Sequence, residues 1–207
     1  MTAKFITVEG GEGGGKSTNI AFIKDYLEKA GKTVVVTREP GGTPIGEKIR
    51  ELLLDKDNTD ISAQTELLLM FAARAQHIER VINPALAAGK WVVSDRFTDA
   101  SYAYQGAGRS IPAERIAVLE KFVVGELRPH LTILLDVPTE IGLQRVSERG
   151  EHDRFEFESD AFFRKVRDAY HLRARQDKER FRIIDATLSL EVVQIKIEQA
   201  LEQLCQS

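Results

Sequence analysis

The sequence predicts an open α/β fold in which five parallel strands form one sheet between two layers of helices. Short apolar runs rich in β-branched residues recur along the chain, amphipathic helical patterns separate them, and a glycine-rich loop follows the first run. Strands that alternate with helices pair in parallel through right-handed crossovers. Ligands of such sheets bind beyond the carboxyl ends of the strands, so the loops at those ends are expected to carry function.

Five apolar runs are predicted to be strands buried on both faces of the sheet, because each is an almost continuous apolar stretch. They cover residues 5–8, 33–37, 91–94, 131–135 and 181–184. Helical spacing of apolar residues fills the intervals, with one pattern ending at Gly31, one spanning residues 67–82 and one ending at Gly125. Ser189 is predicted to cap a final amphipathic helix.

A glycine-rich loop lies between the first predicted strand and the first helix. Residues 10–17 fit G-x-x-x-x-G-K-[ST], in which glycines let successive backbone N–H groups turn around a phosphate. Lys16 is placed to reach the β- and γ-phosphates, and Ser17 to hold Mg²⁺. Glycine-rich turns are common at such positions, but the register of the lysine and serine favours a nucleoside triphosphate site. The predicted binding residues are Gly10, Gly11, Glu12, Gly13, Gly14, Gly15, Lys16, Ser17 and Thr18.

The amino-acid composition excludes several classes of protein function. The chain has 207 residues, 43% of them hydrophobic, which is consistent with a single domain over residues 1–207. Its 29 basic and 32 acidic residues give a formal charge of −3, which argues against a nucleic-acid scaffold or a polybasic membrane anchor. The one cysteine, Cys205, suits a reducing cytoplasm. No apolar stretch approaches the roughly 20 residues of a membrane span, and the first strand begins too early to leave room for a signal peptide. We expect a cytoplasmic protein without a nucleic-acid or membrane partner.

Charged residues follow the second and third predicted strands, at the edge where ligands bind. Arg38 and Glu39 precede a turn of proline and glycines, which any protein could use. Asp95 occupies a strand end at which P-loop proteins often hold a metal-coordinating aspartate. Arg96 beside it could bind a second phosphate bidentately, or the two residues could form an ordinary ion pair.

Two later segments are predicted to line or cover this edge. Residues 101–109 mix aromatic, amide and glycine residues without a helical period, which is typical of a binding loop. Residues 145–154 are dense in both signs of charge. They are predicted to form a mobile lid with a hinge at Gly150, whose arginines exclude water and neutralise a transferring group. A solvated helix end would have the same composition.

Six segments, taken in order, resemble the bacterial thymidylate kinase family, and the resemblance covers essentially the whole chain. They are Glu12 within the loop and residues 37–43, 71–74, 95–97, 104–106 and 185–187. The resemblance implies a three-layer α/β/α P-loop kinase fold and a Mg²⁺-dependent homodimer. It also implies transfer of the γ-phosphoryl group of ATP to dTMP, which gives dTDP and ADP in dTTP synthesis.

The same resemblance assigns roles near the phosphates. Lys16 would act on the transferring group, and Glu12 would lie near the 3′-hydroxyl of the acceptor sugar. The basic residues that would hold or orient the acceptor phosphate are Arg38, Arg50 and Arg96. The acidic residues beside them, near the metal, would be Glu39 and Asp95.

Around the acceptor base, the resemblance implies that Arg74 donates to O4 of thymine and that Gln105 contacts the base, with Ser101 nearby. An arginine can only donate, so it would meet the amino group of cytosine without an acceptor to offer. Tyr104 would crowd C2′ of the sugar and favour deoxyribose. Either Met70 or Phe71 would cover the thymine ring.

In the family, an acidic P-loop without arginine goes with arginines in the lid, which falls here at about residues 142–158. The resemblance therefore assigns the transition-state arginine to Arg154, with Arg149 as the second choice, and places Arg145 beside adenine. One rival is a P-loop kinase with a different acceptor. Another is a nucleotide-dependent switch, although the chain has no Asn-Lys-x-Asp motif for reading guanine.

Overall fold

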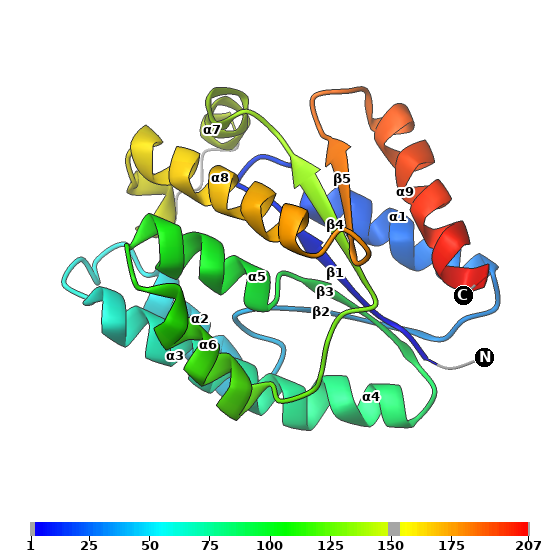
Figure 1. Cartoon of the computed structure of the whole chain (residues 1–207), viewed down its shortest axis with the longest axis horizontal. Helices are drawn as coiled ribbons and strands as arrows, with labels where there is room; N and C mark the ends of the chain where they lie inside the picture. The colour runs from blue at the N-terminus through cyan, green and yellow to red at the C-terminus, as the bar shows by residue number, and fades with distance from the viewer. Residues whose placement is uncertain (1–2, 149–153, 207) are drawn as a thin grey trace.

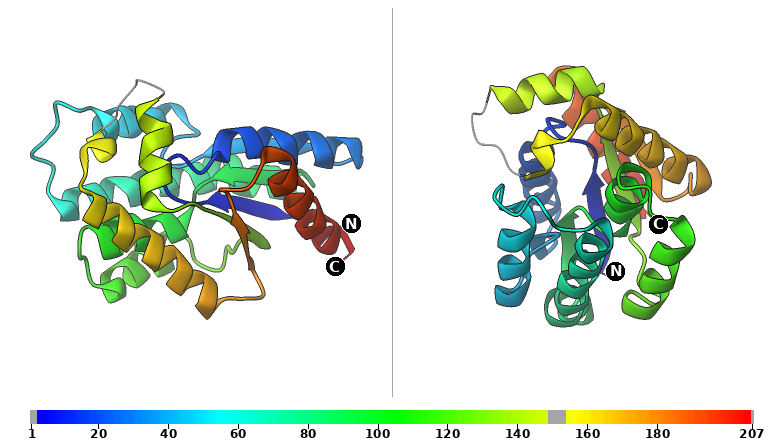
Figure 2. Two further views of the ribbon diagram at one scale, coloured as in Figure 1. Left: turned by 90° about the horizontal axis from the view of Figure 1, so that it is seen from above. Right: turned by 90° about the vertical axis from the view of Figure 1, so that its left-hand side faces the viewer.

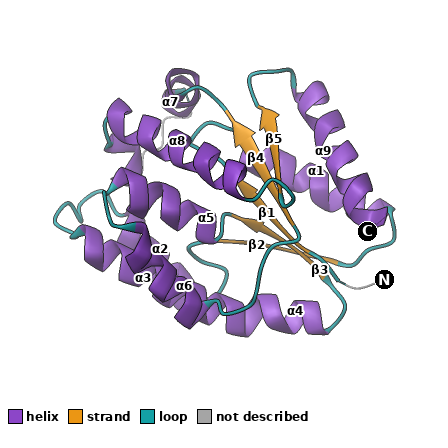
Figure 3. Cartoon of the chain, viewed as in Figure 1, coloured by secondary structure: helices purple, strands orange, loops and turns teal. Residues whose placement is uncertain are grey.

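Figure 1 shows the computed structural model of the chain, in which residues 3–148 and 154–206 are described. Five parallel strands form one sheet in the order β2-β3-β1-β4-β5. The strands are β1 (Phe5–Glu9), β2 (Val34–Arg38), β3 (Trp91–Asp95), β4 (Leu131–Asp136) and β5 (Phe181–Asp185). Helices lie on both faces of the sheet (Figures 2 and 3), which confirms the predicted three-layer fold.

The helices divide between the two faces. On one face lie α1 (Lys16–Lys29) and α9 (Leu190–Gln206), and a larger group on the other includes α3 (Ala63–His77) and α8 (Asp160–Gln176) (Figure 2). The other helices are α2 (Pro44–Leu54), α4 (Asn83–Ala87), α5 (Thr98–Ser101), α6 (Ala113–Val123) and α7 (Thr139–Ser147). Shorter turns are the π-helical η1 (Ile78–Ile82) and η2 (Tyr102–Gly108) and the 3₁₀ turn η3 (Arg154–Phe157). Over residues 3–148 and 154–206, no helix combines the length and apolar character needed to cross a bilayer.

Alternation along β1 decides which of its residues face the site. Successive side chains of a strand point to opposite faces. Ile6 and Val8 pack in the core beneath α1 and α9, whereas Phe5 packs in the core beneath α3 and α6. Glu9 lies four residues after Phe5, so the two side chains point to the same face of the sheet. The carboxyl group of Glu9 accepts a hydrogen bond from the hydroxyl group of Tyr170 in α8. A buried acidic side chain thus stands at the carboxyl end of the central strand.

Two predictions about the strands need correction. Each strand ends one residue later than predicted, because the ladder includes the polar residue at the strand end, as in the pairing of Arg38 with Asp95. β2 and β5 are also not buried on both faces, since Val36 is 43% exposed and Ile183 is 48% exposed. These two strands form the edges of the sheet, where helices cover them incompletely.

The loop conformation predicted for residues 101–109 is wrong, because α5 and η2 make this segment helical. A π-helical turn does not follow the 3.6-residue period. Gly108 lets the turn approach α8, since an added Cβ would lie 2.5 Å from the ring of Phe162. The other π turn, η1, interrupts the helix predicted at 67–82 after His77. The predicted cap is confirmed, because the N–H of Val192 at the start of α9 lies 3.5 Å from Ser189 Oγ.

Candidate active site

The glycine-rich loop joins β1 to α1 in a conformation that needs glycine. Gly13 has a φ of 70°, and an added Cβ would lie 2.2 Å from the carbonyl oxygen of Gly142 in α7. Gly10 has a φ of 140°, and an added Cβ would lie 2.4 Å from the carbonyl oxygen of Leu135. α1 then begins without an acidic residue in its first turn. The unpaired N–H groups and positive dipole end of this helix favour a phosphate at the loop.

Lys16 lies across the inside of this loop. Its Nζ donates to the carbonyl oxygen of Gly11 at 2.9 Å and to that of Gly10 at 3.3 Å. Burial lowers the pKa of the ammonium group, and the positive charge of Arg96 lowers it further. Backbone carbonyl groups thus hold the ammonium beside the turn that would receive phosphate oxygens.

A cavity of about 490 Å³ opens beside the loop and brings most of the predicted site residues together. The predicted residues that line it are Glu12, Gly13, Gly14, Gly15, Lys16, Ser17, Thr18, Arg38, Glu39, Arg50, Met70, Arg74, Asp95, Arg96, Ser101, Tyr104, Gln105 and Arg145. The lining residues that the sequence did not single out are Pro40, Leu54, Phe97, Ala100 and Phe155. Four predicted residues do not line it: Gly10, Gly11, Phe71 and Arg154. Arg149 lies outside the described residues.

Arg96 holds an uncommon backbone conformation at the end of β3. Its φ is 68°, in a region that residues other than glycine seldom adopt and that recurs at functional sites. Its guanidinium donates to the carbonyl oxygen of Gly10 at 2.8 Å and to Glu12 Oε1 at 2.5 Å. The same group stacks 4.8 Å from the ring centroid of Tyr104, whose hydroxyl also donates to Glu12 Oε1, at 2.8 Å. Loop, arginine and aromatic ring therefore form one cluster on the cavity.

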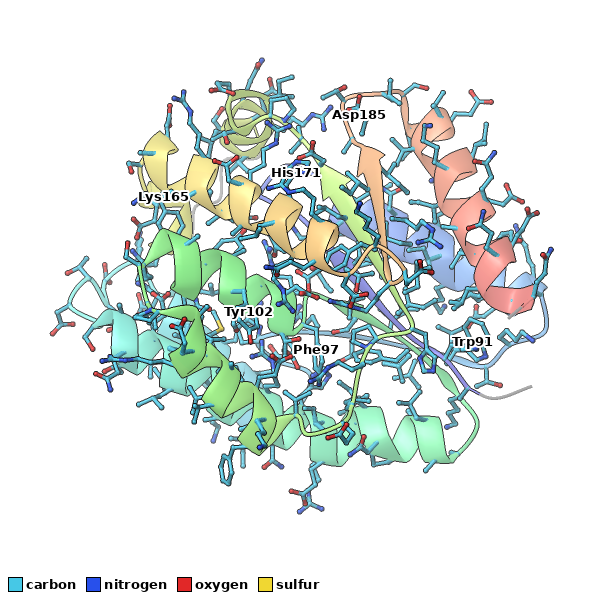
Figure 4. All side chains as sticks on the ribbon, in the orientation of Figure 1. Trp91, Phe97, Tyr102, Lys165, His171 and Asp185 are labelled. Carbon is cyan, nitrogen blue, oxygen red and sulfur yellow. The ribbon has the colours of Figure 1, made fainter. Side chains whose placement is uncertain are left out.

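Arg74 is buried on the opposite wall and is fixed by three hydrogen bonds. Its Nε donates to Glu39 Oε2 at 2.7 Å, Nη1 to Ser101 Oγ at 3.0 Å and Nη2 to the carbonyl oxygen of Phe97 at 3.1 Å. Phe97 is fully buried and is labelled in Figure 4. The other oxygen of Glu39 accepts from His77 Nδ1 at 2.8 Å. Both oxygens of Glu39, which was expected near a metal, are thus used to position this arginine and a histidine.

Helix α3 places the two candidates for covering the base in different surroundings. Met70 lines the cavity. Phe71 is only 2% exposed and packs in the core, with its ring centroid 4.6 Å from the guanidinium carbon of Arg74. Of the two, only Met70 lines the cavity, and Phe71 packs against the arginine from within the core.

Two further arginines, Arg38 and Arg50, line the cavity. Arg38, half-exposed, pairs with Glu47 at 2.8 Å, and Arg50 donates to the carbonyl oxygen of Pro40 at 3.1 Å. Each guanidinium keeps further N–H groups for an anion, because arginine carries five donors. These two arginines and Arg96 all line the cavity that Arg74 also lines.

Asp95 and Ser17 have the chemistry expected of a magnesium site. Asp95 Oδ1 is buried and has no hydrogen-bond partner among the described residues, and both side chains line the cavity. Mg²⁺ in phosphate sites takes only one or two protein oxygens and fills its octahedron with water and phosphate. The described ranges contain no cluster of three or more His, Cys, Asp or Glu side chains that could hold a metal ion.

Comparison with known proteins places this arrangement in a family. The family model described as Thymidylate kinase matches residues 8–197. The chain belongs to the thymidylate kinase family. It is 55% identical over 207 residues to the thymidylate kinase of Ectopseudomonas mendocina (strain ymp), covering 100% of this chain and 99% of that protein.

Two further thymidylate kinases agree with this assignment. That of Pseudomonas savastanoi pv. phaseolicola is 56% identical over 204 residues, covering 99% of this chain and 97% of the relative. The crystal structure of thymidylate kinase from Ehrlichia chaffeensis superposes with a TM-score of 0.79 at 30% identity, covering 98% of this chain and 99% of that one. The resemblance drawn from the six segments is thereby confirmed.

Two arginines of the predicted lid lie in the described part of this thymidylate kinase family member, and they have different surroundings. Arg145 donates to the carbonyl oxygens of Gly13, at 3.2 Å, and Ala186, at 3.0 Å, which links α7 to the loop. Arg154 is buried, and it donates to the carbonyl oxygen of Leu53 at 2.8 Å and to Glu66 Oε2 at 2.7 Å. In this arrangement Arg154 does not line the cavity, whereas the next residue, Phe155, does.

Three fully buried carboxyl groups near the site escaped sequence prediction, namely Glu9, Glu66 and Asp99. Glu9 accepts from the N–H of Phe97 at 2.7 Å and from the hydroxyl of Tyr170 at 2.8 Å. Burial raises the pKa of Glu9 to about 8, and the negative charge of Asp99 adds to the effect. The sequence did contain an indication of Glu9, because this acidic residue directly follows an apolar strand and precedes the glycine-rich loop.

Asp99 has a lowered pKa, in contrast to Glu9. Burial opposes its ionisation, but hydrogen bonds and charges of Arg180 and Arg173 hold its pKa below the ordinary value. Arg180 contacts the carboxylate at 2.6 Å and Arg173 at 2.8 Å. A buried aspartate paired with two arginines therefore ties α5 to α8 and β5 behind the cavity.

Proposed function

We propose that the chain is a dTMP kinase that transfers the γ-phosphoryl group of ATP to dTMP, giving dTDP and ADP for dTTP synthesis. The observation that carries the proposal is the single cavity that joins the phosphate loop to the wall of Arg74 and Gln105, in a chain of the thymidylate kinase family. ATP is the donor and dTMP the acceptor.

The donor half uses the loop and the start of α1. Backbone N–H groups of residues 11–17 would bind the ATP phosphates, and Lys16 would follow the moving group. Ser17 and Asp95 would hold Mg²⁺, which would supply positive charge that neutralises the phosphate oxygens. Arg145, already bound to the loop carbonyl of Gly13, would lie beside adenine.

The acceptor half uses the arginines that line the cavity and the buried wall. Arg96 would fix the attacking phosphate, with Arg38 and Arg50 beside it. Its pairing with Glu12 and Tyr104 keeps the guanidinium in place before the phosphate arrives, and pre-organised donors of this kind need little rearrangement during reaction. Positioning and charge neutralisation dominate phosphoryl transfer, so no general base is required.

Arg74, Gln105 and Ser101 would read the base, Tyr104 would crowd C2′ of the sugar, and Met70 would cover the ring. An arginine donor suits a carbonyl oxygen and rejects an amino group. Arg154 would act on the transition state from a lid at about residues 142–158, within a single domain of residues 1–207. That role requires Arg154 to leave Glu66, because the two groups are paired in this structure.

We also propose that the enzyme is a homodimer in the cytoplasm. Helices α2, α3 and α6 lie side by side (Figure 1), and each of them exposes large apolar side chains. These side chains are Ile45, Leu52, Leu68, Val118 and Phe122. Phe122 is 86% exposed, which is costly for a ring of that size unless a partner covers it. Light scattering coupled to gel filtration tests the dimer, and Phe122→Glu should give a monomer.

The activity is tested by ADP release from ATP and Mg²⁺ with dTMP, dUMP, dCMP, dGMP or AMP as separate acceptors. Strong turnover with dTMP and weaker turnover with dUMP are expected. A preference for another acceptor would overturn the substrate assignment while leaving the phosphate loop chemistry intact.

A further inference from the structure

Behind the acceptor wall lies Glu66, a fully buried glutamate in the first turn of α3 that does not line the cavity. We propose that Glu66 is a positioning residue that determines acceptor specificity by fixing the side-chain amide of Gln105 with its carbonyl oxygen toward the base. This inference rests on the proposed function, because it assumes a nucleotide base against Gln105.

The orientation of the amide follows from the chemistry of the two partners. Gln105 Nε2 donates to Glu66 Oε1 at 2.9 Å. A carboxylate can only accept hydrogen bonds, so the amino end of the amide must face Glu66. Gln105 is 1% exposed, lines the cavity and makes no other side-chain hydrogen bond within the described ranges. Its Oε1 is therefore left as an acceptor for a ligand.

Glu66 is itself held in place by two arginine side chains in this structure. Arg154 donates to Glu66 Oε2 at 2.7 Å, and Arg109 Nε approaches the two carboxylate oxygens at 3.3 and 3.2 Å. Arg109 is anchored in turn by an ion pair with Glu158. A carboxylate can only accept, so Gln105 keeps its orientation even when one of these two guanidinium groups leaves Glu66.

The side chains of Gln105 and Arg74 line the same cavity, and Ser101 links their positions. Ser101 accepts from Arg74 Nη1 at 3.0 Å and precedes Gln105 by four residues, about one turn, along α5 and η2. A donor beside an acceptor is complementary to a carbonyl oxygen beside an N–H group. Thymine and uracil carry this pair at O4 and N3. Cytosine carries an amino group beside a bare ring nitrogen, so it would be mismatched at both positions, and Glu66 would enforce the second mismatch.

The substitution Glu66→Gln tests this role, because a glutamine at 66 can either accept from or donate to the neighbouring amide. Gln105 could then turn its amino end toward N3 of cytosine. We expect the ratio of kcat/KM for dUMP to that for dCMP to fall by about 10-fold, while KM for ATP stays unchanged. The variant Glu66→Asp keeps a group that only accepts, and it should retain the wild-type ratio even if its Tm falls.

A matched control removes a different partner of the same carboxylate. Arg109→Gln breaks contacts to Glu66 without touching the cavity, so it should lower Tm and leave the dUMP to dCMP ratio unchanged. If Glu66→Gln does not fold, Gln105→Leu tests the same step, because loss of the acceptor should lower the ratio similarly.

An unchanged ratio in Glu66→Gln or in Gln105→Leu would overturn the proposal, and so would an equal loss of kcat/KM for every acceptor. The wild-type enzyme separates this failure from failure of the proposed function. Turnover of dTMP with an unchanged ratio in the variants rejects only the role of Glu66, whereas absence of wild-type turnover with dTMP rejects the kinase assignment itself.

Discussion

Replacing Glu9 with glutamine should increase the free energy of unfolding, relative to that of the wild type, more at alkaline pH than at acidic pH. Glu9 is fully buried at the end of β1, where it accepts hydrogen bonds from the N–H of Phe97 and the hydroxyl of Tyr170. Burial raises the pKa of its carboxyl from 4.5 to about 8 in the folded protein. Glutamine has nearly the same shape, keeps an oxygen for the N–H of Phe97, and does not ionise.

The sign and size of the effect follow from linkage between protonation and folding. Because the folded pKa lies above the unfolded one, the folded state binds more protons between them. The stabilisation that protonated Glu9 gives the wild-type protein is complete below pH 4.5 and is lost as the pH rises through 8. At about 1.4 kcal/mol per pH unit, the loss is at most about 5 kcal/mol, of which about 3 kcal/mol falls between pH 5.5 and 8.5.

Urea unfolding at pH 5.5, 7.0 and 8.5 measures this difference. Trp91 is the one tryptophan in the chain, and it lies at the opposite end of β3 from the site (Figure 4), so its fluorescence reports unfolding without touching Glu9. The free energy of unfolding of Glu9→Gln minus that of the wild type should increase by about 3 kcal/mol from pH 5.5 to 8.5. The exposed Glu51→Gln serves as the control. A difference in the free energy of unfolding that does not change with pH would show that folding does not raise the pKa of Glu9.

Three further substitutions test other parts of the account. Gly13→Ala would place a Cβ 2.2 Å from a carbonyl oxygen of α7, so it should raise KM for ATP and lower Tm, and wild-type values for both would contradict the loop geometry. Asp99→Asn would leave Arg180 without its buried counter-charge, and urea unfolding should show a loss of about 3 to 5 kcal/mol; a loss below about 1 kcal/mol would reject that pairing. Arg154→Ala should lower kcat by about 100-fold or more, with a much smaller rise in KM for dTMP, because its contact would form in the transition state. A raised KM with unchanged kcat would exclude that role.

Local patterns in the sequence were sufficient for the parts of the site that depend on neighbours along the chain. The strand, loop and helix around Lys16 follow one another without interruption, so their register fixes the phosphate site. Residues at or just after the ends of β2 and β3, such as Arg38 and Arg96, lie at one edge because the strands are parallel. Their meeting in one cavity follows from topology alone.

The rest depends on pairings between distant elements, which no local pattern contains. Glu66 looks like an ordinary acidic residue in the first turn of a helix, where it complements the helix dipole. Only the packing of η2 and η3 against α3 reveals it as the partner of Gln105 and Arg154. The π-helical turn at residues 102–108 was similarly hidden, because its glycines and aromatic residues lack the usual helical period.

The central claim is that phosphoryl transfer to dTMP takes place in the cavity between the phosphate loop and Arg74. The most direct test incubates the enzyme with ATP labelled in its γ-phosphate, Mg²⁺ and dTMP, and follows the label by chromatography. We expect labelled dTDP and ADP to form in equal amounts, and we expect the Lys16→Ala variant to form neither product. Label in inorganic phosphate, or ADP formation without labelled dTDP, would contradict the central claim.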